Sequence, residues 1–284
     1  MLITQCDSRR PGVDTQGMIC VIGDAHLDVI VLLSGPLRQE TDTPAATSVG
    51  VGGQGANVAA WVAALGQRSR LIAARGADLG GDLVSAELAR RGVDLVGPVT
   101  PAGTGVVVSL SDGGHRRSML TDRGAGAGLD AAQIRQAWLA GCDWLHVSGY
   151  ALGQEPVRSA ALAAIRAARA CSARVSIDLA STALIESCGA AAFGGLIATL
   201  EPDAVFGTGP EAALLAGLLV ADRLIVKLGA DGVHVGGTHF PALPTVPVDA
   251  TGAGDAFAAG YLVGGVELGL AAAARAVAKM GAMP

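Results

Sequence analysis

The most informative stretch of this sequence is VDATGAGDAF, which occupies residues 248–257. Strand-like residues lead into Gly252, Ala253 and Gly254, and an apolar helix is expected over residues 256–266. A helix that begins on small residues leaves its first backbone N–H groups accessible, and the helix dipole adds partial positive charge there. The stretch therefore predicts an anion-binding hole that suits a phosphate group.

Asp255 falls in the first turn of this expected helix and points toward the same space. A carboxylate within reach of a hydroxyl can take its proton as the oxygen attacks phosphorus. Phosphoryl transfer otherwise needs positioning and charge neutralisation. Taken alone, the stretch is explained equally well by a turn followed by an ordinary acidic residue at a helix N-terminus.

A second glycine-rich turn, GGQGAN, occupies residues 52–57. Its glycines allow a ligand to touch the backbone, and the Asn57 amide offers both a donor and an acceptor to a sugar hydroxyl. Residues 50–55 also satisfy the dinucleotide fingerprint GxGxxG. That fingerprint should follow the first strand directly, but residues 18–22 hold this place, and the strand expected at 70–74 ends in Arg75 instead of an acid. The dinucleotide interpretation is therefore disfavoured.

Together the two turns resemble the signatures of the PfkB, or ribokinase-like, carbohydrate kinases. DATGAGDAF is similar to the family's second signature, with Ala250 where threonine is usual, and GGQGANVA is similar to the first. The resemblance extends from about Cys20 to Ala282. It implies that Asp255 is the catalytic base and that Asp249 belongs to a monovalent-cation site. It further implies that Gly252, Ala253 and Gly254 form the anion hole. The sugar contacts that it implies in the first signature are Gly53, Gln54 and Asn57.

The turn GDAHLD at residues 23–28 resembles the family's substrate-binding turn. The resemblance aligns Asp28 with the sugar-binding aspartate and makes Asp24 its partner. His26 falls where ribokinases carry an amide, so it either tunes the choice of substrate or is a polar turn residue without a role. Arg123, near the expected lid, is a further candidate for a substrate contact.

On the nucleotide side, LIVKLGADGV at residues 224–233 is similar to the family's vTLGxxG element. The resemblance brings Gly229 and Gly232 close to the ATP phosphates. Lys227 replaces the usual threonine, and it either contacts phosphate or is a solvent-facing lysine at a strand end.

Residues 208–211, TGPE, stand where the family carries Asn-x-x-Glu. Glu211 matches the residue that arranges Mg²⁺ through water, whereas Thr208 departs from the pattern. Asp178, at the end of an expected strand, is either a similar acid near the phosphates or a structural cap. The helical tail after residue 268 is shorter than is usual in the family.

Outside these motifs, short apolar strands alternate with Ala- and Leu-rich helices. This pattern predicts an α/β fold with a parallel sheet. The resemblance further implies a three-layer, doubly wound and mostly parallel sheet of the ribokinase-like type. Residues 29–51 and 105–120 alternate like antiparallel strands and are expected to form a small β lid. We expect residues 1–17 to be a flexible leader and residues 18–284 to form one kinase domain.

Composition narrows the class of protein further. The chain has 284 residues, of which 51% are hydrophobic and 16% charged, which excludes a disordered chain. A net charge of −5 without a Lys/Arg cluster argues against a nucleic acid partner. The longest apolar runs are too short to span a membrane. Five scattered cysteines without a CxxC pair indicate reduced thiols and a cytoplasmic protein.

The resemblance therefore implies an ATP-dependent phosphotransferase that moves the γ-phosphate to a hydroxyl of a small sugar such as ribose, fructose or a keto-deoxy sugar acid. ATP, Mg²⁺ and K⁺ are the expected cofactors, and the lid strands are expected to pair in a homodimer because an exposed sheet edge seeks a partner. One alternative is a nucleoside kinase, although aromatic residues that could stack on a base make up only 3%. Another alternative is a sugar- or nucleotide-binding relative that has lost catalysis, which Thr208 and the short tail favour.

Overall fold

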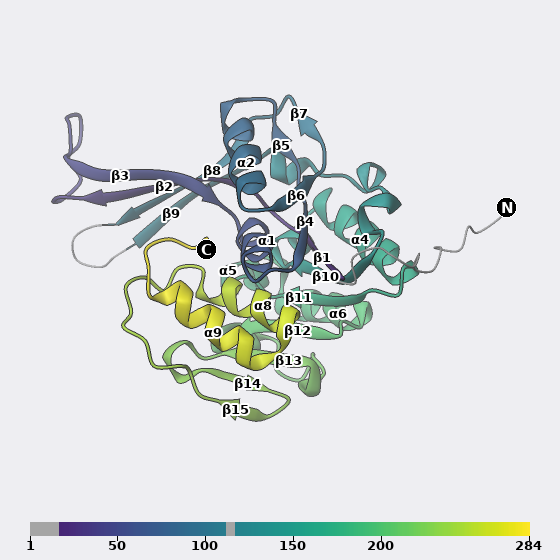
Figure 1. Ribbon diagram of the computed structural model, residues 1–284. Helices are drawn as coiled ribbons and strands as arrows, with labels where there is room; N and C mark the ends of the chain where they lie inside the picture. Colours follow the sequence, from purple (N-terminus) through teal and green to yellow (C-terminus); the bar gives the residue numbers. More distant parts are fainter. Residues whose placement is uncertain (1–16, 112–116) are drawn as a thin grey trace.

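The fold is seen in a computed structural model that describes residues 17–111 and 117–284 (Figure 1). The expected leader, apart from Gly17, lies outside the described residues. Within them, a nine-stranded sheet forms the centre of the molecule. In spatial order its strands are β15 (Thr238–Phe240), β14 (Val233–Val235), β13 (Leu224–Lys227), β12 (Ala204–Thr208), β11 (Arg174–Asp178), β10 (Cys142–Ser148), β1 (Met18–Ile22), β4 (Arg68–Ile72) and β6 (Val93–Val96).

The seven strands from β13 to β6 are parallel to one another, and β14 and β15 add an antiparallel edge. The alternating side chains of β1 bury both faces of the sheet, because successive residues of a strand point to opposite sides. Ile19 and Val21 belong to one core, and Cys20 and Ile22 belong to the other. The chain therefore folds as the three layers that the sequence predicts.

The helices cover both faces of the sheet (Figure 1). The face that carries Ile19 packs against α1 (Gln54–Ala64), α8 (Ala253–Gly264) and α9 (Val266–Val277). The opposite face packs against α3 (Tyr150–Gly153), α4 (Val157–Ala170), α5 (Thr182–Cys188) and α6 (Ala190–Leu200).

Shorter elements complete the fold. A two-stranded sheet pairs β5 (Arg75–Gly76) with β7 (Val99–Thr100), and α2 (Leu79–Arg90) packs beside β6. The remaining helices are α7 (Gly209–Leu214) and the 3-10 turns η1 (Ala125–Gly128), η2 (Ala131–Gln133), η3 (Gln136–Leu139), η4 (Ala221–Arg223) and η5 (Gly229–Asp231). No single helix in residues 17–111 or 117–284 is long and apolar enough to cross a membrane; α5 and α6 would pass only as a pair, bent by 98°.

A separate four-stranded sheet forms the lid and projects from the body of the molecule (Figure 1). Its order is β3 (Ala45–Gly52), β2 (His26–Leu33), β8 (Thr104–Ser111) and β9 (Arg117–Gly124). The outer pairs are antiparallel, as expected, but the central pair β2–β8 is parallel. The lid is therefore a mixed sheet, because its two hairpins are joined side by side and not in sequence order.

Candidate active site

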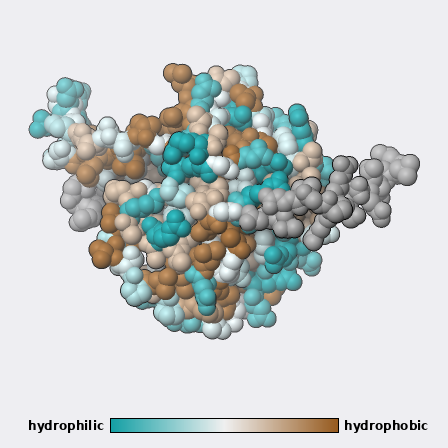
Figure 2. Space-filling model, viewed as in Figure 1, coloured by the Kyte–Doolittle hydropathy of each residue, from teal (hydrophilic) through white to brown (hydrophobic). Residues whose placement is uncertain are grey.

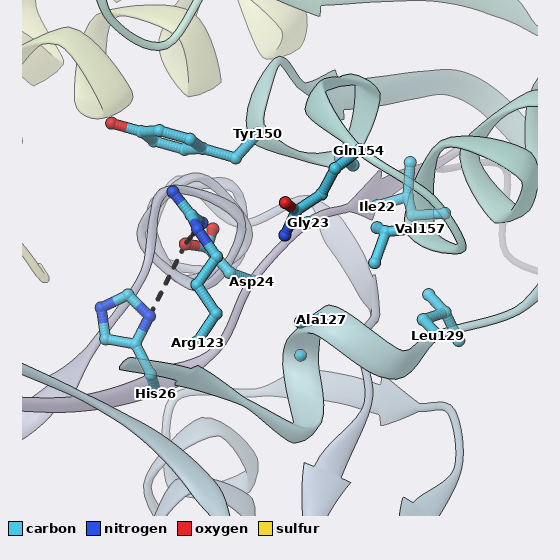
Figure 3. Close-up of a pocket in the computed structure, with 12 residues that line it drawn as sticks. Ile22, Gly23, Asp24, His26, Arg123, Ala127, Leu129, Tyr150, Gln154 and Val157 are labelled. Atoms are coloured by element: carbon cyan, nitrogen blue, oxygen red, sulfur yellow. Dashed lines mark ion pairs between the residues drawn. The ribbon is translucent and has the colours of Figure 1, made fainter. Parts of the chain in front are cut away.

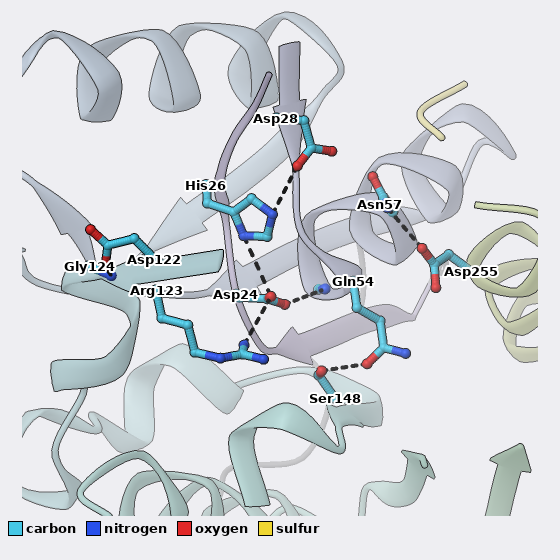
Figure 4. Close-up of polar contacts among 11 residues, drawn as sticks. Asp24, His26, Asp28, Gln54, Asn57, Asp122, Arg123, Gly124, Ser148 and Asp255 are labelled. Carbon is cyan, nitrogen blue, oxygen red and sulfur yellow. Dashed lines mark hydrogen bonds and ion pairs between the residues drawn. The ribbon is translucent and has the colours of Figure 1, made fainter. Parts of the chain in front are cut away.

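The polar residues of the site gather where the parallel strands end. Ser148, Asp178, Thr208 and Lys227 are the last residues of β10, β11, β12 and β13, and Asp24 follows β1 by two residues. Ligands of open α/β sheets bind outside this carboxyl edge of the strands. The sequence motifs therefore meet at the edge where a ligand site is expected (Figure 4).

The turn before α8 has the shape that the VDATGAGDAF stretch predicts. Gly252 has a φ of 77°, and a Cβ atom there would lie 2.5 Å from the Cβ of Ala282. Only glycine fits, because the backbone is left-handed and the end of the chain packs against it. Ala253 donates its backbone N–H to the carbonyl of Ala250 at 3.2 Å, and α8 begins there. Gly254 and Asp255 follow in the first helical turn.

Asp255 is partly buried and accepts a hydrogen bond of 2.8 Å on Oδ2 from Nδ2 of Asn57 (Figure 4). Burial raises the pKa of Asp255 to about 7, and the nearby carboxylate of Asp178 adds to this rise, whereas the Asn57 hydrogen bond and Lys227 oppose it. The Oδ1 atom of Asn57 is buried and has no partner among the described residues. A carboxylate with a pKa near neutrality and an unused acceptor beside it suit the deprotonation of a hydroxyl.

The GGQGAN turn joins the lid to α1. Gly53 has a φ of 108°, and a Cβ atom there would lie 2.5 Å from the carbonyl oxygen of Asp24. Gln54, predicted as a sugar contact, donates Nε2 to Oδ1 of Asp178 at 3.0 Å and accepts the Ser148 hydroxyl on Oε1. The Gln54 side chain is thus held between two strand ends.

A chain of charges lies at the base of the lid (Figures 3 and 4). His26 places Nε2 3.1 Å from Oδ1 of Asp28 and Nδ1 3.6 Å from Oδ2 of Asp24. Arg123 continues the chain, with Nη1 3.6 Å from Asp24 and its guanidinium 4.2 Å from the centre of the Tyr150 ring. Burial acts to lower the pKa of His26, but Asp28 and Asp24 outweigh it, so that its pKa is raised. Asp24, His26 and Asp28, the three residues predicted in this turn, therefore lie in contact with one another.

A small cavity lies behind this chain of charges (Figure 3). It measures about 30 Å³, which is room for roughly one water molecule. Its polar wall is formed by Asp24, His26, Arg123, Tyr150 and Gln154, and its apolar wall includes Ile22, Leu129 and Val157. No sequence pattern indicates Tyr150 as the stacking partner, because α3 and β9 meet only in the fold.

The second cavity, of about 570 Å³, lies between the β13–β14 turn, the segment 242–247 and helices α8 and α9. This volume is typical of small-molecule and cofactor sites. Its wall is mainly apolar, with Leu243, Phe257, Leu270 and Val277. The predicted nucleotide residues all line it, namely Thr208, Lys227, Gly229 and Gly232.

Lys227 lies on the wall of this cavity and interacts with two carboxylates, those of Asp178 and Asp255. Its Nζ lies 2.6 Å from Oδ2 of Asp178, whose side chain is only 2% exposed, and 3.3 Å from the position that a Cβ of residue 254 would take. Burial acts to lower the pKa of Lys227, but Asp178, followed by Asp255, outweighs it and the pKa is raised. Lys227 is therefore a fixed cation beside the first turn of α8, and Asp178 is its counterion.

The two predicted metal residues have backbone partners. Glu211 is buried and accepts the backbone N–H of Thr208 on Oε2 at 2.8 Å. Asp249 accepts the N–H of Thr251 at 2.9 Å and that of Gly281 at 3.0 Å, so it ties the loop before α8 to the residues after α9. Among the described residues no group of three or more His, Cys, Asp or Glu side chains could hold a metal ion. A single carboxylate such as that of Glu211 is the kind of protein group that Mg²⁺ uses when it is bound to phosphates and keeps several waters.

The sequence is similar to known carbohydrate kinases. The family model for the pfkB family of carbohydrate kinases matches residues 16–283. A fructokinase of Salmonella typhimurium is 33% identical over 265 residues, covering 86% of this chain and 83% of its own. An ATP-dependent ribose-1-phosphate kinase of Halopiger xanaduensis is 32% identical over 225 residues, covering 74% and 72%.

Solved structures show the same fold. An adenosine kinase of Sinorhizobium meliloti superposes with a TM-score of 0.80 at 23% identity, covering 95% of this chain and 96% of its own. A proposed ribokinase II of E. coli, solved in complex with ATP and Mg²⁺, superposes with a TM-score of 0.79 at 22% identity, covering 94% of both chains.

Proposed function

The chain belongs to the pfkB family of carbohydrate kinases and phosphorylates a sugar with ATP as the donor, and we propose that Asp255 is the base that activates the accepting hydroxyl. The similarity to fructokinases supports fructose, or a ketose of similar size, as the acceptor. Ribose and keto-deoxy sugar acids are the other candidates.

The observation that carries this assignment is the hydrogen bond between Asn57 and Asp255. It brings the GGQGAN turn, with its sugar-binding chemistry, against the helix start that suits a phosphate. A sugar held by Asn57, Gly53 and Asp28 would present a hydroxyl within reach of the Asp255 carboxylate. Asp24 and His26 would complete the sugar side of the pocket.

In the proposed reaction, ATP supplies the phosphoryl group and the sugar supplies the attacking hydroxyl. The Asp255 carboxylate takes the hydroxyl proton while the sugar oxygen forms a bond to the γ-phosphorus, and the bond between that phosphorus and the ADP oxygen breaks. The backbone N–H groups of Gly252 and Gly254 would stabilise the charge on the transferred group, while Ala253, whose N–H donates to Ala250, holds the turn in shape. Lys227 adds a positive charge to the same wall.

ATP would occupy the cavity of about 570 Å³, with its phosphates toward Lys227, Gly229 and Gly232. Mg²⁺, bound with ATP, would neutralise phosphate charge. Glu211 would reach it through water, and Thr208 lines the same cavity. We further propose K⁺ near Asp249, because this carboxylate holds together the two backbone segments whose carbonyls would surround the ion.

We also propose that the lid mediates a homodimer. Paired residues form an apolar row across all four lid strands, Val49–Val29–Val108–Leu120. Val49 and Leu120 are 61% and 56% exposed, and Figure 2 shows apolar side chains gathered along the lid at the upper left. An apolar sheet face with this exposure is typical of an association surface. The requirement for ATP favours a cytoplasmic location.

A nucleoside kinase is the second candidate, because an adenosine kinase shares the fold. Tyr150 is the one Phe, Tyr or Trp ring among the described residues that line the sugar-side cavity, and Arg123 already stacks on it. Little aromatic surface is therefore left on which the nucleobase of a nucleoside could stack. A binding protein without catalysis is opposed by the geometry of Asp255 and Lys227.

The test is ADP release with ATP, Mg²⁺ and K⁺ across a panel of ketoses, aldoses, sugar acids and nucleosides, with Asp255→Asn as the control. Turnover of a sugar that the variant loses would support the proposal. Turnover of nucleosides alone would favour the second candidate, and thermal stabilisation by a sugar without any turnover would favour a binding protein.

A further inference from the structure

Each cationic side chain at the site faces a carboxylate. Among the described residues that line the two cavities, the cationic side chains are Arg123, His26 and Lys227. Lys227 is paired with Asp178 on the nucleotide side. On the sugar side, Arg123 faces Asp24, and His26 lies between Asp24 and Asp28.

The charges of the sugar side therefore leave no positive excess. With His26 protonated, two cations face the two carboxylates of Asp24 and Asp28. If His26 loses its proton, one negative charge remains. Asp255, which must be ionised to act as a base, adds another in either case. The net charge of the pocket is therefore negative in every protonation state in which Asp255 can act as a base.

Arg123 is also held in place by its neighbours, and this prevents it from binding an incoming anion. Its guanidinium lies between the Tyr150 ring and the Asp24 carboxylate, at 4.2 Å from the ring centre and 3.6 Å from Oδ2 (Figure 3). Asp24 is fixed in turn, because its Oδ1 accepts the backbone N–H of Gly55 at 3.3 Å. To bind a second anion, Arg123 would have to leave a partner that cannot follow it.

We propose that this pocket selects an uncharged sugar and rejects sugar acids and sugar phosphates, with Asp24 as the specificity-determining residue. The inference rests on the proposed function and narrows its substrate class. Hydroxyl groups donate to carboxylates, so a neutral sugar gains hydrogen bonds from Asp24 and Asp28. A substrate carboxylate or phosphate would instead meet like charges at short range, which is strongly unfavourable. The relatives include kinases named for a neutral and for a phosphorylated sugar, and the geometry points to the first.

The test compares sugars that differ only in a phosphate, namely fructose with fructose 1-phosphate and ribose with ribose 1-phosphate, by ADP release. For the wild type we expect kcat/KM of the better neutral sugar to exceed that of its phosphate by about 100-fold or more. If a phosphorylated sugar reaches within about tenfold of its neutral partner, the inference is wrong while the proposed function stands. If no sugar is turned over, both fail.

Asp24→Asn tests the residue itself. The amide still accepts from Gly55, so the start of α1 is preserved, but Arg123 loses its counterion and becomes available to an anion. We expect kcat/KM for the phosphorylated sugar to rise by about tenfold, a gain that simple damage to the pocket cannot give. Adding Arg123→Gln should remove the gain. A lack of gain in Asp24→Asn would overturn the role of Asp24.

Asp122→Asn is the matched control. Asp122 is exposed, precedes Arg123 and points toward the N–H of Gly124, away from Asp24 (Figure 4). It removes the same charge from the same segment without touching the pocket. We expect unchanged kinetics with all four sugars. An equal gain in this variant would show a general field effect and would contradict the assignment to Asp24.

Discussion

The amide of Asn57 and the carboxylate of Asp255, which are 198 residues apart in the sequence, are joined by a hydrogen bond of 2.8 Å. Asn57 lies in the first turn of α1 and Asp255 in the first turn of α8. The first turns of the two helices therefore lie side by side. This single contact unites the two glycine-rich turns into one candidate site.

Replacing Asp255, the proposed base, should greatly slow turnover and leave sugar binding intact. For Asp255→Asn we expect kcat to fall by about 10²–10⁴-fold, the usual contribution of a positioned base. The amide oxygen introduced by this substitution can still accept a hydrogen bond from Asn57, so thermal stabilisation by the sugar should persist. Coupled ADP release and thermal shift measure the two effects, and near-normal turnover would show that another group is the base.

The pH dependence of kcat should follow Asp255. Its pKa is about 7, so kcat should rise with pH through this range as the carboxylate forms. The same shift acts against stability, because a raised folded pKa means that Asp255 destabilises the fold progressively as pH rises from about 4 to 7. Asp178→Asn removes a charge that raises the pKa and should move the acidic limb of the kcat profile to lower pH. If the acidic limb stays at the same pH in this variant, Asp178 does not raise the pKa of Asp255.

Lys227 should contribute to both stability and turnover. Lys227→Met leaves the buried Asp178 carboxylate without its partner, which should lower the free energy of unfolding by about 3–5 kcal/mol. It should also lower kcat by about 10²–10³-fold if Lys227 stabilises the transferred phosphate. Combining it with Asp178→Asn should restore stability but not kcat. Denaturant unfolding and steady-state kinetics separate the two, and restored turnover in the double variant would remove Lys227 from the mechanism.

Gly252 should be intolerant of alanine for two separable reasons. Its positive φ makes any side chain strained by about 1–2 kcal/mol, and the added Cβ would also meet Ala282. Gly252→Ala should therefore lower Tm and kcat. Gly141→Ala is the control, since its φ of 74° is similar but no atom lies within 4 Å of the added Cβ. It should lower Tm alone; equal kcat losses would show that the contact with Ala282 is irrelevant.

The lid dimer should depend on the apolar row that contains Val49. Val49→Asp places a charge at one end of this apolar row, on the edge strand β3, and should shift the wild-type dimer to monomer in sedimentation velocity. Val99→Asp, on β7 and 55% exposed, makes the same substitution outside the lid and should leave the dimer intact. A monomeric wild type would refute the proposal directly.

The sequence predicted what local patterns encode. The first strand has the expected bounds of 18–22, and α8 covers residues 253–264, where a helix was expected over residues 256–266. The small residues before α8 and the glycines before α1 also marked the two turns, because only special backbone geometry requires them. The family resemblance that these two turns carry implied the ribokinase-like architecture, and the structure neighbours confirm it.

Relationships between distant segments were not predictable in the same way. The parallel pairing of β2 with β8 joins strands that are far apart in sequence, and alternation of apolar residues is the same for parallel and antiparallel neighbours. The pairing of Lys227 with Asp178 likewise depends on which strands end side by side. For Asp24, His26 and Arg123, the motif indicated the location, whereas the charge balance emerged only from the three-dimensional arrangement.

Gly53 alone separates the last residue of β3 from the first residue of α1. Any displacement of β3 is therefore transmitted to Gln54 and Asn57 within one turn of helix. A chimera that exchanges lids between related enzymes would have to carry these residues along, since the transferable module ends at Asn57 and not at the boundary of the sheet.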